Sequence, residues 1–154
     1  MADTDGQAPI EIAIEVGEGD RALADRLDDE IYAFNCEATG ITDGRLLTIR
    51  ATAPDGQLAG GVSGWTWGGC GYVDALWVEE GHRGRGLGTR LMDAAEQATR
   101  DRGGNRMVLS THTFQAPEFY RRRGYVEHGR IDGYPAGHAQ LYLTKDLERT
   151  ADDR

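Results

Sequence analysis

The chain has 154 residues, which is an ordinary size for one domain and enough to bury a hydrophobic core. Its formal net charge of −9 argues against nucleic acids and anionic membranes as partners, because these are held mainly through neutralised phosphates, and it favours cationic substrates. No stretch approaches the roughly 20 apolar residues of a membrane span, and the two cysteines, Cys36 and Cys70, predict neither a disulfide scaffold nor a metal site.

Both ends of the chain are expected to lack regular structure. Residues 1–9 have neither a basic start nor an apolar run, so we interpret them as a short disordered tail and not as a signal peptide. Residues 149–154 are expected to fray. The sequence therefore predicts a single domain over residues 10–148, and the cytoplasm is the default expectation for its location.

The first predicted elements are a strand and a helix. Residues 10–16, IEIAIEV, place an apolar side chain at every second position, which is typical of a strand with one buried face. From Asp20, a candidate N-cap, apolar residues recur at helical spacing and predict a helix to about Asn35. Residues 36–44, rich in Thr, Gly and Asp, are predicted to form a loop.

Three strands are predicted next. Residues 46–52 and 57–67 flank a Pro-Asp-Gly turn, which is the strongest hairpin signal in the chain. Gly68 and Gly69 turn the chain again into residues 72–78, YVDALWV, which are apolar on both faces except at Asp74. Such a run is typical of a buried central strand.

A glycine-rich segment follows this central strand. Gly84, Gly86 and Gly88 stand at alternate positions with arginines between them, and no acidic residue lies between His82 and Arg90. Glycine allows consecutive N–H groups to point into one concavity, and a helix that begins there adds its free N–H groups and its dipole. The segment therefore predicts an anion site at the start of a helix over 87–102, whose apolar stripe is Leu87, Leu91, Ala94, Ala95 and Ala98.

Two common phosphate-binding loops do not fit this segment. A dinucleotide fingerprint counted from Gly84 needs a third glycine where Thr89 stands. A Walker loop needs a lysine before Ser or Thr, and the only lysine of the chain is Lys145.

The rest of the chain predicts a strand, a helix and two strands. Residues 106–111 are a short apolar run, and the following helix has Pro117 in its first turn. Residues 124–131 and 139–147 close the sheet. The predicted fold class is α+β, with three α/β/α layers around a mixed, mainly antiparallel sheet of about seven strands that has helices on both faces.

The sequence resembles the GNAT superfamily of N-acetyltransferases in two motifs, which occur in the order found in that family. Residues 83–88, R-G-R-G-L-G, are similar to its pyrophosphate loop R/Q-x-x-G-x-G/A, which follows a central strand and opens a helix. Residues 116–125 resemble its stretch A-x-x-x-Y-x-x-x-G-F/Y. The resemblance implies a GNAT-like fold and acetyl-CoA as co-substrate, without a metal.

The same resemblance implies how the cofactor is held. Backbone groups of Leu76, Trp77 and Val78 would bond the pantetheine arm, and the N–H groups from Arg83 to Thr89 would hold the diphosphate. Many members have an asparagine where Thr113 stands, so that contact is expected from Thr113 or Gln115. The implied cofactor-binding residues are Leu76, Trp77, Val78, Arg83, Gly84, Arg85, Gly86, Leu87, Gly88, Thr89, Thr113 and Gln115.

The resemblance also implies catalytic roles. It places the Val78 N–H at the thioester carbonyl and Tyr120 beside the sulfur. Acyl transfer to an amine needs a fixed donor for the oxyanion and a proton for the departing thiolate, which these two groups can supply. The alternative for Tyr120 is a packed helix tyrosine whose hydroxyl is satisfied nearby.

The general base stays open. An amine attacks only in its neutral form, so a group near the end of the central strand must take a proton. Asp74 and Glu79 are the first candidates, His112 and His138 are further ones, and a chain of waters is an alternative.

The acceptor pocket is expected where aromatic walls lie beside acids, because such walls suit a cationic amine. Core packing is the alternative for at least one of the two tryptophans. The candidate substrate-binding residues are Tyr32, Asn35, Trp65, Trp67, Tyr134 and His138.

We therefore expect an acetyl-CoA-dependent N-acetyltransferase that acts on a primary amine of a small molecule, such as an antibiotic, a polyamine or an amino-acid derivative. One alternative acceptor is a protein N-terminus or lysine, and a different class of function is a non-catalytic acyl-CoA sensor. The triplet Arg121–Arg123 is interpreted as a helix cap or a contact to the adenosine phosphate and not as a nucleic-acid site. Monomer and homodimer both stay open.

Overall fold

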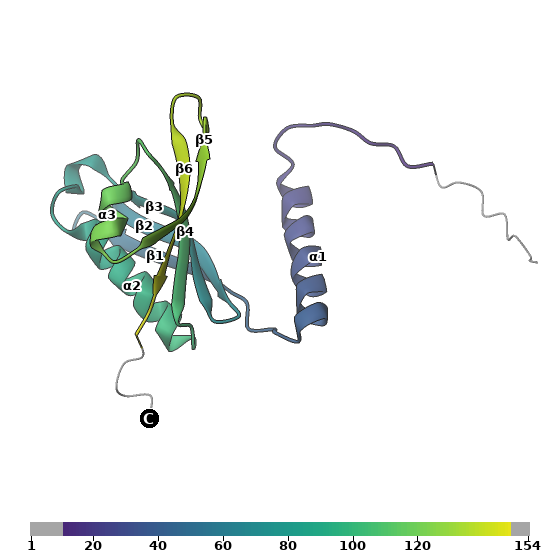
Figure 1. Ribbon diagram of the computed structural model, residues 1–154, viewed down its shortest axis with the longest axis horizontal. Helices are drawn as coiled ribbons and strands as arrows, with labels where there is room; N and C mark the ends of the chain where they lie inside the picture. Colours follow the sequence, from purple (N-terminus) through teal and green to yellow (C-terminus); the bar gives the residue numbers. More distant parts are fainter. Residues whose placement is uncertain (1–10, 149–154) are drawn as a thin grey trace, which may run out of the picture. The chain divides into compact units, whose positions relative to one another are not determined.

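A computed structural model describes residues 11–148 of the chain, and the predicted tails at 1–9 and 149–154 lie outside this range. The described part of the chain divides into two units, with the division between Gly40 and Ile41 (Figure 1). The division does not test the single domain predicted over 10–148, which stays a prediction. Among residues 11–148, no helix is long and apolar enough to cross a bilayer.

The first unit contains helix α1, Arg21–Thr39. The predicted N-cap is confirmed, because Asp20 Oδ1 accepts a hydrogen bond from the Leu23 N–H at 2.9 Å. The helix runs past its predicted end at Asn35 and stops only at Gly40, which has a left-handed φ of 71° and donates to the Cys36 carbonyl.

The strand predicted at 10–16 is wrong for its described part, since residues 11–16 have no regular secondary structure. Alternation gives a segment one apolar face, but a strand also needs a neighbour to pair its backbone groups.

The second unit is built on one mixed sheet of six strands, in the order β1-β2-β3-β4-β6-β5. The pair β3 and β4 is parallel, and all other neighbours are antiparallel. The α+β class with a mainly antiparallel sheet is confirmed, with six strands in place of about seven. The strands are β1 Arg45–Thr52, β2 Leu58–Trp67, β3 Cys70–Val78, β4 Arg106–His112, β5 Val126–Asp132 and β6 Ala139–Asp146.

Helices α2, Leu87–Asp101, and α3, Pro117–Arg122, pack on one core with the sheet (Figure 1). The core centres on fully buried side chains of α2, β4 and β6, which are Met92, Met107, Leu109, Leu141 and Leu143. Ala94, assigned to the apolar stripe of α2 from its spacing, is exposed; the buried positions of that face are Leu91, Met92, Ala95, Glu96 and Thr99. The buried face is thus rotated about the helix axis relative to the predicted one, so that it includes Met92 and Thr99 and leaves Ala94 in solvent.

Candidate active site

The central strands β3 and β4 pair only over their first halves. Their parallel register runs from Cys70 opposite Arg106 to Val73 opposite Leu109 and goes no further, although β3 continues to Val78. Asp74 lies at an irregularity of the β2–β3 register, immediately after the last paired residue. Among the described residues, the second half of β3 therefore has no strand partner on the side of β4, and this side is called its free edge.

The register of β3 with β2 determines which backbone groups of β3 point toward this free edge. The Glu79 N–H donates to the Ala59 carbonyl at 2.9 Å, and Trp77 lies opposite Gly61. Because hydrogen-bonded pairs alternate along an antiparallel ladder, the backbone groups of Trp77 face β2, whereas those of Leu76 and Val78 face the free edge. The expectation that the Trp77 backbone bonds the pantetheine arm is therefore wrong. Leu76 and Val78 remain candidates for this contact.

The glycine-rich loop joins β3 to α2 through a short 3-10 turn, η1, Glu80–His82. Gly84 and Gly86 adopt left-handed φ values of 71° and 80°, which only glycine takes without strain, and Gly86 is the N-cap of α2. The Arg83 N–H already donates to the Glu80 carbonyl at 3.2 Å. The Arg83 N–H is therefore not free to bind the diphosphate, contrary to the expectation from the sequence.

From Gly84 to Thr89, no backbone N–H has a hydrogen-bond partner within residues 11–148. The helix begins without a side-chain cap, so its first free amides and the positive end of its dipole stay available to an anion. Arg85 and Arg90 flank these amides, both are exposed, and neither makes an ion pair with a described residue. The combination suits a doubly charged group such as a diphosphate.

The three arginines at the end of α3, residues 121–123, differ in their ion pairs. Arg121 pairs with Glu118 and with Glu127, and Arg123 pairs with Asp93 at 2.6 Å. Arg122 has no ion pair among the described residues. It lines an open hollow of about 590 Å³ beside the glycine loop, together with Thr89, Asp93, Glu96, Phe119, Arg123 and Lys145.

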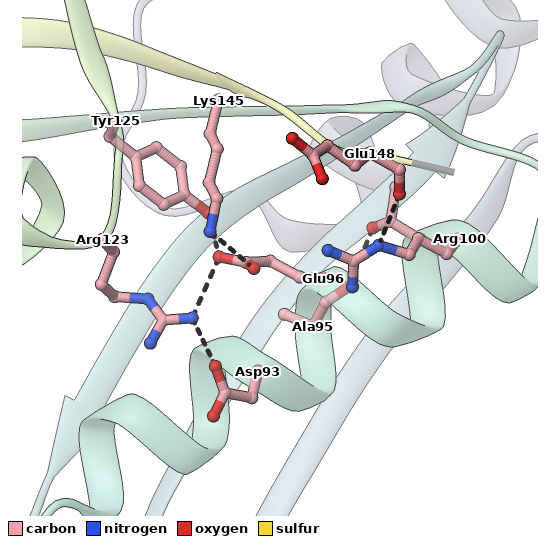
Figure 2. Close-up of polar contacts among 9 residues, drawn as sticks. Asp93, Ala95, Glu96, Arg100, Arg123, Tyr125, Lys145 and Glu148 are labelled. Atoms are coloured by element: carbon pink, nitrogen blue, oxygen red, sulfur yellow. Dashed lines mark hydrogen bonds and ion pairs between the residues drawn. The ribbon is translucent and has the colours of Figure 1, made fainter. Parts of the chain in front are cut away.

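A buried carboxylate ties α3 to α2. Glu96 Oε1 accepts from Arg123 Nη2 at 3.0 Å and from the Tyr125 hydroxyl at 3.2 Å, and Glu96 Oε2 accepts from Lys145 Nζ at 2.9 Å (Figure 2). Burial and the Glu96 charge raise the pKa of Tyr125 well above its ordinary value. This network ties the residues that follow α3 to α2 and β6.

Tyr120 lies in α3 with a buried ring that contacts Phe119 and Tyr125 edge to face, at centroid distances of 5.1 and 5.7 Å. Its hydroxyl has no hydrogen-bond partner among residues 11–148 and is not sealed from solvent. Burial raises the pKa of Tyr120, so the phenol keeps its proton. The expectation of a hydroxyl satisfied nearby is therefore wrong.

The loop after β4 carries the residues expected at the asparagine position of the family motif. Thr113 is tied to β6, because its N–H donates to the Ala139 carbonyl at 2.9 Å and its hydroxyl oxygen accepts from the Ala139 N–H at 3.1 Å. Gln115 Oε1 accepts from the His112 N–H at 2.9 Å. The Gln115 amide nitrogen has no partner among the described residues, so it remains the freer donor of the two candidates.

An aromatic and imidazole cluster gathers at the end of β4 and in the β5–β6 turn. His112 stacks on Phe114 at 5.3 Å and meets the edge of Tyr134 at 5.5 Å, and Phe114 meets His138 at 4.9 Å. The structure thus brings together His112, Tyr134 and His138, which the sequence singled out separately. Phe114 was missed, although its place between His112 and Gln115 gave a signal.

The tryptophans of β2 lie outside the buried core. Trp65 stacks on Tyr72 of β3 with a centroid distance of 4.3 Å and is 41% exposed, and Trp67 donates its indole N–H to the Ile41 carbonyl. The expectation that one of them fills the core is wrong, and Tyr72 was missed as a partner. Tyr32 and Asn35 belong to α1 in the first unit and stay predictions.

The two carboxylates proposed as bases differ in their surroundings. Glu79 Oε2 accepts from the Gly81 N–H at 2.8 Å and caps the η1 turn, which is a structural role. Asp74 is exposed at the irregularity of β3 and has no hydrogen bond or ion pair to a described residue.

Comparison with known proteins matches residues 17–125 to the model of the acetyltransferase (GNAT) family. Blasticidin-S acetyltransferase of Streptomyces morookaense is 40% identical over 116 residues, which cover 71% of this chain and 83% of the relative. The crystal structure of a putative acetyltransferase from Agrobacterium tumefaciens is similar with a TM-score of 0.80 and 28% identity, over 89% of this chain and 100% of the other.

A more distant structure shares the fold. A putative streptothricin acetyltransferase from Bacillus anthracis, solved in complex with acetyl coenzyme A, has a TM-score of 0.59 and 21% identity. The similarity covers 67% of this chain and 63% of that one.

Proposed function

This chain belongs to the GNAT acetyltransferase family, and on that premise we propose that it transfers an acetyl group from acetyl-CoA to a primary amine of a small cationic molecule. The observation that carries the proposal is the free edge of β3, which ends at a loop of unpaired amides between Gly84 and Thr89. An extended amide-containing arm fits the edge, and a diphosphate fits the loop.

The residues present fit acetyl-CoA. Leu76 offers its backbone groups to the pantetheine amides, and Val78 offers its N–H at the end of the arm, while the loop amides, Arg85 and Arg90 neutralise the diphosphate. Arg122 and the adjoining hollow lie where the adenosine phosphate can follow. When bound, the cofactor supplies an acetyl group activated as a thioester.

Two groups of the chain serve the chemical step. The Val78 N–H is a fixed donor for the oxyanion, and loss of one such donor costs roughly 2.7–4 kcal/mol in comparable reactions. Tyr120 donates the proton that the departing sulfur needs, because its buried phenol stays protonated and its hydroxyl is unpaired.

The acceptor is proposed to be a small cationic amine. The acidic protein attracts cations, and the exposed aromatic side chains of Trp65 and Tyr134 can hold them through cation–π contacts. The similarity to an enzyme named for blasticidin S supports a small antibiotic-like acceptor. The unpaired Tyr120 hydroxyl favours catalysis over a sensor that only binds acyl-CoA.

The test measures free thiol release from acetyl-CoA with a panel of acceptors. The panel holds blasticidin S, streptothricin, polyamines, amino-acid amides and unacetylated peptides, with fully N-acetylated forms of the same compounds as controls. We expect turnover with at least one small amine and none with its acetylated form. Turnover confined to peptides would replace the acceptor, and a thermal shift with coenzyme A but no turnover would favour the sensor.

A further inference from the structure

The side chain of Gln115 has a defined orientation. One of its terminal atoms lies 2.9 Å from the backbone N–H of His112 and 3.1 Å from the hydroxyl of Thr111, which is buried. A backbone N–H can only donate, so this terminal atom must be the carbonyl oxygen Oε1. The amide cannot be flipped without placing two donors against each other.

The same oxygen selects one tautomer of His112. His112 Nδ1 lies 3.3 Å from Gln115 Oε1, and two acceptors facing each other would repel. Nδ1 therefore carries the hydrogen, and the lone pair of the neutral ring is on Nε2. Phe114, stacked at 5.3 Å, and Tyr134, edge-on at 5.5 Å, hold the ring plane.

His112 lies on the face of the sheet that carries two aromatic side chains of the proposed acceptor wall. It ends β4, the strand that leaves β3 after Leu109. Leu109 and Thr111 of β4 are buried in the core, so alternation turns His112 to the opposite face of the sheet, on which Trp65 and Tyr72 also lie.

We propose that His112 is the general base of the acetyl transfer and that Gln115 is its positioning residue. The inference rests on the proposed function, since it assigns the proton acceptor of that reaction. Nε2 takes a proton from the ammonium form of the acceptor, which frees the nitrogen lone pair for attack. This role needs a defined tautomer, and Gln115 supplies it.

The protons balance over the whole step. The amine nitrogen bonds to the acetyl carbon, the carbon–sulfur bond breaks, and its electron pair goes to sulfur, which takes the Tyr120 proton. The second proton of the attacking nitrogen passes to the Tyr120 oxygen and restores the phenol. His112 returns its proton to solvent, so each transfer from an ammonium releases one proton.

The other titratable groups around this position are less well arranged. Tyr134 and His138 approach from the β5–β6 turn, and His138 has only the edge of Phe114 and no hydrogen bond from its ring among the described residues. From β3, Glu79 caps its own turn and Asp74 has no partner that orients it.

The tautomer is tested first, on the unaltered protein. The chain has four histidines, so nitrogen-15 spectra of its imidazoles can be assigned by single replacements. We expect His112 to show Nδ1 protonated and Nε2 bare above its titration midpoint. The opposite tautomer, or a mixture of both, would overturn the role of Gln115. This result does not depend on any activity, so it separates failure of the inference from failure of the proposed function.

The base role is tested by pH profiles of kcat/KM with an accepted amine. We expect an acidic limb whose midpoint follows the His112 titration seen by NMR, and His112→Gln should lose about 10²–10⁴-fold and the limb itself. His128→Gln, at an exposed position of β5, is the matched control and should keep both. A His112→Gln variant that keeps the limb would contradict the proposal.

The positioning role is tested by two replacements of Gln115. Gln115→Glu keeps an oxygen for the Nδ1 hydrogen and adds a negative charge that favours the imidazolium, so the acidic limb should move to higher pH while the tautomer is retained. Gln115→Ala should lose the tautomer preference and lower kcat. Equal behaviour of the two variants in the NMR spectra would overturn the assignment.

Discussion

The Nε of Arg83 donates to the carbonyl oxygen of Val78 at 2.9 Å, which ties the glycine loop to the end of β3. The two parts of the proposed cofactor site, the free strand edge and the loop amides, are thereby held in one geometry. The side chain of Arg83 serves this link, whereas its amide is already bonded to Glu80.

Replacement of Arg83 by lysine tests this link without a change of charge. Lysine lacks the planar guanidinium that reaches the Val78 carbonyl, and one net hydrogen bond is worth about 0.5–1.5 kcal/mol. The dissociation constant for coenzyme A, measured by calorimetry, should rise about 2- to 12-fold. Arg85→Lys makes the same change two residues further along the loop and should raise the dissociation constant less; an equal rise would mean that the strand link is unimportant.

Alanine substitutions at two left-handed glycines can distinguish backbone strain from an effect on ligand binding. Gly86→Ala places a Cβ at a φ of 80°, which costs roughly 1–2 kcal/mol of folding stability, and should also weaken coenzyme A binding because it shifts the loop amides. Gly56→Ala, at a φ of 86° in the β1–β2 turn, is the matched control. Both added Cβ atoms meet open space, so the control should lose stability alone.

Tyr120→Phe removes a hydroxyl that has no partner among the described residues. We expect folding stability near that of the wild type and a fall in kcat of about 10²-fold or more, with coenzyme A binding retained. Tyr125→Phe removes the hydroxyl bonded to Glu96 and should do the reverse, with lower stability and kcat preserved. Unchanged turnover in Tyr120→Phe would remove the proton-donor role.

The buried tyrosines predict how stability depends on pH. The pKa values of Tyr120 and Tyr125 are raised in the folded chain, so the unfolded chain loses these protons first as the pH passes about 10. The free energy of unfolding should therefore fall above that pH, by up to about 1.4 kcal/mol per pH unit for each tyrosine. Urea titrations of Tyr125→Phe should show a smaller fall, while Tyr142→Phe, at an exposed site, should match the wild type.

Local signals predicted much of this structure. Asp20 caps α1, the Pro-Asp-Gly turn joins two strands, and Gly86 opens α2, because caps and turns depend on few residues. The strand predicted at residues 10–16 was wrong in its described part, because a strand needs a neighbouring strand and an alternating pattern does not reveal whether one is available.

The sequence predicted the glycine loop of the candidate site, but it did not predict how the side chains and backbone groups around that loop are oriented. The motif pointed to the amides after β3, but only the register with β2 shows that Trp77 turns its backbone groups away. Likewise, the sequence offered His112 and Gln115 as separate candidates, and their 3.3 Å contact depends on how the loop after β4 folds back. Contacts of this kind depend on tertiary geometry.

The most direct test of the account is a crystal structure of the protein with coenzyme A. The account predicts the diphosphate within hydrogen-bond distance of amides between Gly84 and Thr89, and the pantetheine arm along the free edge of β3 at Leu76 and Val78. A diphosphate bound elsewhere, or an arm that leaves this edge unpaired, would contradict it.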